Sequence, residues 1–444
     1  MRLLSYWGIA PNDSRGCCAF PGPQERLPLF NFYRMAGQRR YRERVGMNNK
    51  TTNHSHKRMM SGFCSTALIA CFVLGGSTAF AQTSYKVTDL GVLPSKEESV
   101  PAAINGQGLV AGTSIAEASG EAAFRYNPYN PAPMEDIGQS SRGVVSRGFG
   151  INNTGMAVGD AAFIASHTAD SPIRHAALFN NGSLIDLGTL KKQTFSRANG
   201  INGFNQVVGF SGPELDSPKS RAFFWSKSTG MVDLGTLGGS YAQAFAINDS
   251  GAITGNSEVR SSATDTEAIH AFLSASPSGA GAIGMRDLGT LGGSFSYGMA
   301  INANKHVVGY STVNKVDNRV HAFWFDGTGM KDLGTLAPKL SSPLDDQSVA
   351  LGVNSSDRVV GYSYLPAFNA TTDPAVQPGT SPVRQVAFVW YQGTMTDLNK
   401  LIGTAAETYH LNSAMGINDN GQIVATALSK ATGARRAVLL TPTK

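Results

Sequence analysis

Residues 231–255 read MVDLGTLGGSYAQAFAINDSGAITG, and this stretch carries the signals that decide the fold. Small and bulky residues alternate up to Ile247-Asn248, as they do in a β-strand with different neighbours on its two faces. Asn248-Asp249-Ser250-Gly251 then places Asn at the first position of a turn and Gly where a positive φ is needed. A type I turn closed by a glycine bulge joins two antiparallel strands. The stretch therefore predicts a β-hairpin.

The same signals recur seven times along the chain, in one cyclic order. Asp-Leu-Gly or a close variant begins at Asp89, Asp136, Asp186, Asp233, Asp287, Asp332 and Asp397. An Ile-Asn or Val-Asn pair ends at Asn105, Asn152, Asn202, Asn248, Asn302, Asn354 and Asn418. A Val-Val-Gly-like triplet ends at Gly112, Gly159, Gly209, Gly255, Gly309, Gly361 and Ala425. An Ala-Phe-like pair begins at Ala123, Ala176, Ala222, Ala271, Ala322, Ala387 and Ala437. The chain is thus seven copies of one structural unit.

Each unit is predicted to form four short antiparallel strands, called A to D in chain order. Strand A is the segment that ends in Ile-Asn, and strand B is the Val-Val-Gly segment, as in 306–310. Strand C is the Ala-Phe segment, as in 222–225, and strand D is the segment with Asp-Leu-Gly, as in 231–237. Repeated four-stranded units are typical of a propeller. We therefore predict an all-β, seven-bladed β-propeller of four-stranded antiparallel blades, with an open β-solenoid as the alternative.

The repeat begins and ends in the middle of a unit. A lone strand D, residues 85–90, opens the repeat region, and a lone strand C, residues 436–440, closes it. Pairing of these two strands would complete the seventh blade with the first strand of the chain. Such a closure removes exposed sheet edges, whereas a linear solenoid has no reason to divide a unit between its two ends.

Residues 1–81 differ in composition from the rest of the chain. They hold 11 of the 37 Lys and Arg residues and 3 of the 31 Asp and Glu residues, so residues 82–444 contain 26 basic and 28 acidic residues. All four cysteines, Cys17, Cys18, Cys64 and Cys71, also lie there. The repeat region has no excess of basic residues for nucleic acid and no thiolate for a disulfide or a metal.

The end of this region has the three parts of a secretory signal peptide. Lys57-Arg58 is followed by an apolar stretch from 59 to 75, and Ala79-Phe80-Ala81 has the small residues of a cleavage site. We predict a signal peptide over 47–81 that is cleaved after Ala81, a propeller over 82–444, and a disordered, over-extended start over 1–46. Export to the periplasm or the exterior is expected, with no stable membrane insertion of the mature chain. A lipid anchor on Cys71 is the alternative, because 68–71 resembles a lipobox.

The string His-Ala-Phe, followed by Met-x-Asp-Leu-Gly-Thr-Leu-Gly-Gly-Ser, occurs in its fullest form at 270–272 and 285–294. It resembles the bacterial HAF-type extracellular repeat family, and the resemblance covers essentially residues 85–440. It implies an exported repeat protein and says nothing of an activity or a ligand.

Residues that are present in every copy are expected to be scaffold, because a functional residue need appear only once. The seven Asp of Asp-Leu-Gly are therefore predicted to cap a local turn rather than bind calcium. The His of His-Ala-Phe occurs in separate units, at His175, His270 and His321, which argues against a shared zinc site. No metal and no cofactor are predicted.

Long B–C and D–A loops gather at one rim of the predicted ring, where binding sites usually lie. Four and six places before the strand A Ile, the copies diverge, and aromatic and Arg side chains occur there. These candidate ligand-binding residues are Arg147, Phe195, Arg197, Tyr241, Gln243, Phe295 and Tyr297. Aromatic rings beside Arg can stack a sugar or bind an acidic group.

We therefore expect a monomeric binding protein for a glycan or a protein ligand. A propeller enzyme of the glycosidase or lyase type is one alternative, and a structural envelope component without a discrete site is the other. The carboxylates that acid–base catalysis would need, at Glu97, Glu98, Asp345, Asp346 and Glu407, are expected to be solvated.

Overall fold

The computed structural model describes residues 83–130, 132–138, 145–164, 173–180, 182–214, 217–260, 268–277, 284–316, 319–337, 346–366 and 383–443. They all fall in one unit, Thr78–Lys444. The predicted signal peptide, with Ala79 and Ala81, the residues before it and Cys71 lie outside the described residues. Within the described ranges, no helix has the length and the apolar character needed to cross a membrane.

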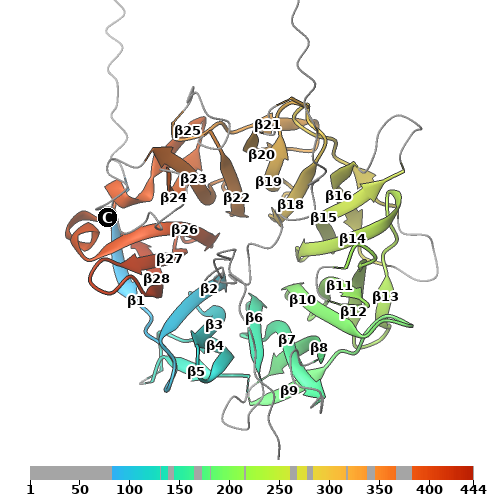
Figure 1. Ribbon diagram of the computed structural model, residues 1–444, viewed down its shortest axis with the longest axis horizontal. Helices are drawn as coiled ribbons and strands as arrows, with labels where there is room; N and C mark the ends of the chain where they lie inside the picture. The colour runs from blue at the N-terminus through green and yellow to red at the C-terminus, as the bar shows by residue number, and fades with distance from the viewer. Residues whose placement is uncertain are drawn as a thin grey trace, which may run out of the picture. The chain divides into compact units, whose positions relative to one another are not determined.

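Seven antiparallel sheets of four strands, numbered here as blades 1 to 7, follow one another around a central axis (Figure 1). The predicted fold class is therefore confirmed. Blades 1 to 3 consist of β2 (Glu98–Ile104), β3 (Val110–Ala116), β4 (Gly120–Tyr126) and β5 (Met134–Asp136); β6 (Ser146–Ile151), β7 (Ala157–Ile164), β8 (Ile173–Asn180) and β9 (Ser183–Asp186); and β10 (Phe195–Ile201), β11 (Val207–Gly212), β12 (Arg221–Ser226) and β13 (Gly230–Asp233).

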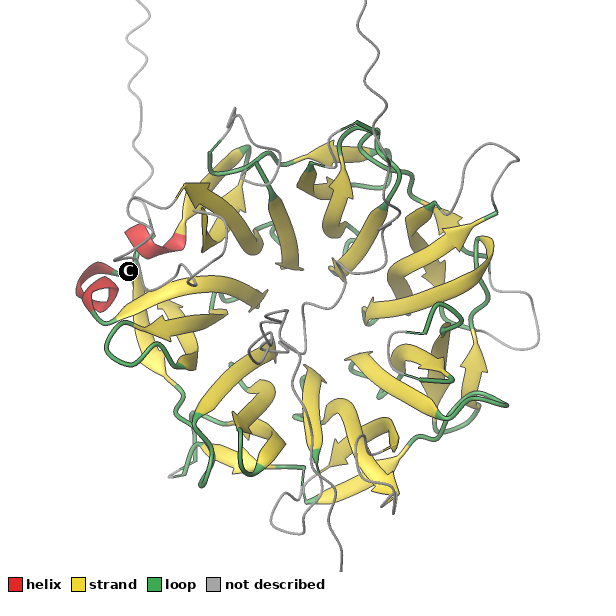
Figure 2. Ribbon diagram, in the orientation of Figure 1, coloured by secondary structure: helices red, strands yellow, loops and turns green. Residues whose placement is uncertain are grey.

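Blades 4 to 7 follow the same order from strand A at the axis to strand D outside. They consist of β14 (Gly238–Ile247), β15 (Ala252–Val259), β16 (Ile269–Ala275) and β17 (Arg286–Asp287); β18 (Ser296–Ile301), β19 (Val307–Thr312), β20 (Val320–Phe325) and β21 (Met330–Asp332); β22 (Ser348–Val353), β23 (Val359–Pro366), β24 (Val383–Tyr391) and β25 (Thr394–Asp397); and β26 (Tyr409–Ile417), β27 (Ile423–Ser429), β28 (Arg435–Pro442) and β1 (Tyr85–Asp89). Two short 3-10 helices, η3 (Leu398–Lys400) and η4 (Gly403–Glu407), connect blades 6 and 7 (Figure 2).

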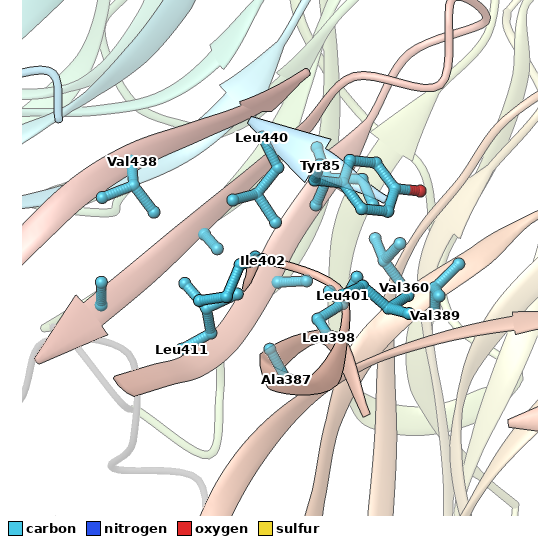
Figure 3. Packing of buried hydrophobic residues seen from close by; sticks show 14 of the residues in the cluster. Tyr85, Val360, Ala387, Val389, Leu398, Leu401, Ile402, Leu411, Val438 and Leu440 are labelled. Carbon is cyan, nitrogen blue, oxygen red and sulfur yellow. The ribbon is translucent and has the colours of Figure 1, made fainter. Parts of the chain in front are cut away.

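The first strand of the repeat region completes the last blade, as predicted. β1 pairs with β28 in antiparallel register, with Val87 opposite Leu440 and Asp89 opposite Val438. Tyr85, Leu440 and Val438 share a buried cluster with residues of η3 and of the segment after it (Figure 3). The ring is thus closed by pairing between its first and last strands, which leaves neither strand with an open inner edge.

A closed ring of asparagine side chains links all seven blades. The Nδ2 of each Ile-Asn or Val-Asn asparagine donates to the backbone carbonyl of the corresponding Asn in the next blade, over 2.8 to 3.2 Å. The members in order are Asn105, Asn152, Asn202, Asn248, Asn302, Asn354 and Asn418, and Asn418 donates back to Asn105. Each Oδ1 also accepts backbone N–H groups of its own A–B turn, as from Ala252 to Asn248 at 2.9 Å. One side chain therefore shapes the turn and joins two blades.

The A–B turns have the predicted geometry, but glycine is needed less often than predicted. The residue with a positive φ is Gly in four copies, and in the others it is Asn205, Lys305 and Asp357, with φ of 59°, 64° and 59°. Lys305 and Asp357 are accommodated because the Asn side chains hold both turns, at Asn302 and Asn354.

A backbone bulge in every strand A explains two features of the repeat. The pairing of strands A and B shifts by one residue in each blade, as between Ala244 and Ala246. The bulged residue two places before the Ile is the bulky one noted in the repeat, for example Phe245. Opposite the bulge, a Cβ on Gly255 would lie 2.0 Å from the carbonyl oxygen of Gln243. The Gly of Val-Val-Gly is therefore required by close approach of the backbones.

Strand D ends earlier than predicted. Residues 231–237 were expected to form it, but β13 stops at Asp233. The Asp233 carboxylate accepts the N–H of Gly235 at 2.8 Å, and Gly235 has a φ of 84°, so the backbone leaves the sheet there. The same carboxylate-to-backbone bond forms in all seven copies, which confirms that these Asp residues cap a turn. The following Leu or Ile is buried in every copy, as Leu234 is at 2% exposure.

Replacement of Asn248 by Ala should destabilise the fold more than any change at an exposed turn residue. It removes the bond to the Asn302 carbonyl, which keeps only the Lys305 N–H, and it leaves the Ala252 N–H without its partner. We expect a loss of about 1–3 kcal/mol in the free energy of unfolding, measured by urea denaturation. Ser250→Ala in the same turn is the control, because it removes only the hydroxyl that donates to Asn248 Oδ1 at 2.8 Å and keeps the bond between the blades. A loss of equal size in both variants would contradict a special role for the asparagine ring.

Candidate ligand-binding site on the inner strands

The two ends of the inner strands differ in how much they vary. The A–B turns and the asparagine ring lie where strand A ends, and the D–A and B–C loops meet at the opposite end, where strand A begins. All seven candidate residues lie at this second end, on β6, β10, β14 and β18, or directly before β18 in the case of Phe295. The structure thus gathers them at one level of the ring.

Their surroundings differ from the loop setting that the sequence suggested. Arg147, Arg197 and Gln243 are buried, with exposures of 4%, 8% and 3%, and Phe195 is buried as well. Tyr241, Phe295 and Tyr297 are half-buried. Except for Phe295, which directly precedes β18, they lie on inner strands rather than in the loops.

Arg147 and Arg197 belong to a buried ionic cluster. Arg147 Nη2 lies 2.7 Å from the carboxylate of Asp160, its cross-strand neighbour on β7, and Arg197 Nε from blade 3 reaches the same carboxylate at 2.9 Å. Arg174 Nη1 on β8 lies 3.6 Å from Asp160 and 2.9 Å from Glu121 on β4. The cluster therefore ties blades 1, 2 and 3 together.

Two physical effects keep this cluster charged. Burial alone would raise the pKa of Asp160, but the positive charges of Arg147 and Arg197 outweigh it and lower the pKa to about 2. The Arg197 guanidinium also lies over the ring of Phe149, 4.8 Å from its centroid. Cation–π contact and ion pairing together offset the free-energy cost of burying the Arg197 guanidinium.

Aromatic residues fill the same level in blades 5 and 6. Tyr297 and Tyr310 face each other across β18 and β19 and stack with centroids 4.8 Å apart and planes 8° apart. Phe295 meets Tyr297 edge to face at 5.9 Å, and Tyr362 belongs to the same cluster. Burial, and to a lesser degree the nearby Tyr241, raises the pKa of Tyr297, so its hydroxyl stays protonated.

Blade 4 has two carboxamides at this level. Gln243 on β14 is opposite Asn256 on β15, and Asn256 is fully buried. Gln243 Oε1 and both amide atoms of Asn256 have no hydrogen-bond partner within the chain. A buried polar atom without a partner costs about 1–3 kcal/mol, so this pair requires an explanation.

Sequence reasoning missed the strand B half of this level. The residue after each Val-Val-Gly-like triplet pairs with the candidate position on strand A and also varies between copies: Thr113, Asp160, Phe210, Asn256, Tyr310, Tyr362 and Thr426. The triplet itself provided the signal, because the place after it is occupied by five residue types.

The carboxylates expected to be solvated are only partly so. Asp346 is 4% exposed and pairs with Arg319 at 2.8 Å, and Glu98 binds Arg435 Nε at 2.7 Å across the closure of the ring. Both find an Arg partner on a neighbouring blade, which removes the cost of burial. Glu97 and Glu407 are exposed, and Asp345 lies outside the described residues.

The described side chains provide no group of three His, Cys, Asp or Glu residues that is suited to a metal ion. Each His of the His-Ala-Phe strings instead contacts the Asp of Asp-Leu-Gly in its own blade, as His270 does with Asp287 at 2.8 Å. His321 does the same with Asp332. In the part of the chain that is described, these histidines therefore support strands C and D in separate blades.

The ionic cluster does not have the properties of an acid–base pair. Glu121 and Asp160 lie close together, because both contact Nη1 of Arg174. A glycosidase needs one carboxyl with a raised pKa to donate a proton, whereas the pKa of Asp160 is lowered. Asp160 therefore stays ionised at neutral pH and cannot donate a proton there.

Fold and site together define a seven-bladed β-propeller whose inner strands vary at one end only. The family described as "Protein of unknown function (DUF3466)" matches residues 239–438 of this chain. A comparison with curated proteins finds no match.

Solved structures share the general fold with this chain. The β-propeller domain of the trilobed protease from Pyrococcus furiosus is 11% identical, with a TM-score of 0.44, over 81% of this chain and 98% of that one. An oligogalacturonate lyase in complex with manganese is 12% identical, with a TM-score of 0.43, over 82% of this chain and 95% of that one. A polysaccharide lyase, the PL25 ulvan lyase, is 9% identical, with a TM-score of 0.33, over 80% and 93%. At these identities the likeness concerns the fold alone.

Asp160→Asn should destabilise the protein strongly at neutral pH. It leaves Arg147 and Arg197 buried without their counter-charge, and we expect a loss of about 3–5 kcal/mol in urea unfolding. The folded-state pKa lies below the unfolded value, so the stabilisation is present above about pH 4 and is lost as the pH falls through about 2. The difference between wild type and variant should therefore shrink below pH 4. The exposed Glu117→Gln should have no effect at either pH. A constant difference down to pH 2 would contradict this account of the cluster.

Proposed function

We propose that this protein is an exported β-propeller that binds a glycan or protein ligand at the end of the ring where the D–A and B–C loops meet. The ligand would contact the variable side chains of the inner strands, with Arg147, Arg197, Tyr241, Gln243 and Tyr297 among them. Phe195 and Phe295 would supply apolar contact at the same level.

The contrast between the two ends of the inner strands carries this proposal. At the A–B end, the seven blades repeat one bond, from Asn side chain to Asn backbone. At the other end, one and the same strand position holds an ion pair in blade 2, two amides in blade 4 and stacked tyrosines in blade 5. A scaffold requires repetition, whereas recognition of a single ligand requires differences placed on rigid elements.

The test begins with a glycan array and a pull-down, which identify a ligand. Tyr241→Ala combined with Phe295→Ala should then weaken its binding by tenfold or more, or about 1.4 kcal/mol, measured by calorimetry. Both side chains are half-buried, so thermal unfolding must first show that the variant is folded. Addition of Phe195→Ala should weaken binding further.

Phe204→Ala is the control for this experiment. Phe204 is 70% exposed and lies in an A–B turn, at the opposite end of the inner strands. Its replacement should leave the affinity unchanged. The proposal fails if the variants of Tyr241 and Phe295 bind as well as wild type, or if only the Phe204 variant binds less.

Export is the second part of the proposal, and it rests on the leader sequence, in which Ala79-Phe80-Ala81 follows an apolar stretch over 59–75. Expression from the natural gene in a bacterial host should yield an extracytoplasmic protein whose first residue is Gln82, as determined by intact mass and N-terminal sequencing. Ala79→Arg together with Ala81→Arg should block this processing, because the signal peptidase needs small residues at both places. A lipid-modified Cys71, or retention of residues before Gln82 in the wild-type product, would contradict cleavage after Ala81.

A further inference from the structure

The carboxamide pair of blade 4 differs from the equivalent pairs in other blades. Where this strand A position faces strand B, Arg147 bonds to Asp160, Tyr297 stacks on Tyr310, and the Arg197 guanidinium lies over the ring of Phe210. In those blades the two cross-strand partners contact each other through an ion pair, a ring stack or a cation–π contact. Gln243 and Asn256 are opposite each other in the same register.

Three amide atoms of this pair have no partner. They are Gln243 Oε1, Asn256 Oδ1 and Asn256 Nδ2, and the two residues are 3% and 0% exposed. An apolar pair of similar size would fill the position without leaving polar atoms unpaired. The amide pair instead presents two acceptor oxygens and one NH₂ donor group, which a bound ligand can satisfy.

The side chains around the pair make its location specific. Tyr241 lies two residues before Gln243 on β14, within an irregularity of the β14–β15 pairing between Gly238 and Ala242. Tyr241 is also close enough to affect the ionisation of Tyr297 on β18 of the next blade. In the ring, β14 stands between β10, with Arg197, and β18, with the stacked tyrosines (Figure 1). The amide pair is thus the neutral polar element between a charged sector and an aromatic sector.

The chemistry of the three atoms selects the kind of group that fits them. The amides have no charge, so a buried ionic group would lack a counter-charge there. A hydroxyl donates and accepts at once, and two neighbouring hydroxyls can satisfy two acceptors and an NH₂ group together. Cross-strand neighbours have Cβ atoms only about 5 Å apart, which matches one small ring rather than an extended segment. An adjacent tyrosine face suits the apolar face of such a ring.

We propose that Gln243 and Asn256 form a subsite for a neutral sugar ring, bound through adjacent hydroxyls with an aromatic contact from Tyr241 or Tyr297. This inference rests on the proposed function, because it names the class of ligand for the same end of the ring. It selects a glycan over a protein partner.

The test uses the pair of near-isosteric apolar replacements Gln243→Met and Asn256→Leu in the full-length protein. If the amide atoms are unpaired in the free protein, the double variant should unfold at a higher temperature, by about 2 °C or more. The same variant should bind a neutral sugar at least tenfold more weakly. An opposite sign for stability and binding is the specific expectation, because a purely structural role would lower both.

The probes are cellobiose, mannobiose, lactose and N,N′-diacetylchitobiose, with digalacturonate as the charged sugar and a blocked tripeptide as the peptide. Binding to wild type, measured by ligand-observed NMR and calorimetry, should be found for at least one neutral disaccharide. Asn304→Leu is the matched control, since it makes the same substitution at an exposed site in an A–B turn. It removes the bond from Asn304 Nδ2 to the Ser355 carbonyl, so it should leave the affinity unchanged and should not raise the unfolding temperature.

Several outcomes overturn the inference. A lower unfolding temperature for the double variant would mean that the amides have a structural role. Binding of the tripeptide or of digalacturonate alone would assign the site to another class of ligand. If a ligand is lost on replacement of Tyr241 and Phe295 but kept by the double variant, the subsite fails and the proposed function stands. If the ligand still binds both to the Tyr241 and Phe295 variant and to the double variant, both proposals are contradicted.

Discussion

The closed ring of asparagine hydrogen bonds is the constraint on which this structure depends. Each Asn fixes its own A–B turn through Oδ1 and the next blade through Nδ2, so local geometry and the spacing of blades are set by one side chain. Because the seventh bond returns to the first blade, the number of blades is tied to bond geometry as well as to packing. Five serines at the start of strand A add a second set of links, accepting the N–H of strand C in the preceding blade: Ser99, Ser146, Ser196, Ser296 and Ser348.

These links explain why variation is confined to one end. The ring of Asn residues and the bulge behind it use backbone carbonyls and N–H groups at close approach, and a Cβ on Gly255 has no room there. At the start of strand A, the position opposite the residue after the Val-Val-Gly-like triplet contacts its neighbours through its side chain. An ion pair, an amide pair or an aromatic pair can each occupy that place without a change in the backbone. The propeller therefore offers seven independently variable positions on one rigid frame.

The fold could be predicted from the sequence because its signals repeat seven times. The contacts of the candidate site were harder to predict because they involve residues that occur only once. The four strands, their order and the closure between residues near Tyr85 and Val438 follow from signals that occur seven times. Burial of Arg147 and Arg197 depends on Asp160, which occurs once, so no repeat signal pointed to it. Similarly, the positive φ of Lys305 is possible because the Oδ1 of Asn302 holds the turn. A prediction that expects Gly wherever φ is positive does not take this side-chain bond into account. The turn cap at the Asp of Asp-Leu-Gly was predicted, but strand D was extended past it to residue 237, whereas the bond from Gly235 N–H to Asp233 ends the strand at Asp233.

The pairing of β1 with β28 also determines when folding of the propeller is complete. The Thr443 hydroxyl donates to the Ser84 carbonyl, and these residues are separated by 359 positions in the chain. Contacts between residues so distant must overcome a large entropy of loop closure and form slowly. Individual blades can arrange themselves as soon as their four strands are available, but blade 7 lacks its outer strand until β1 and β28 meet. β28, which is synthesised last, must therefore pair with β1 before folding is complete. Until then, the outer edge of β28 is open to pairing with another strand, including one of a second molecule.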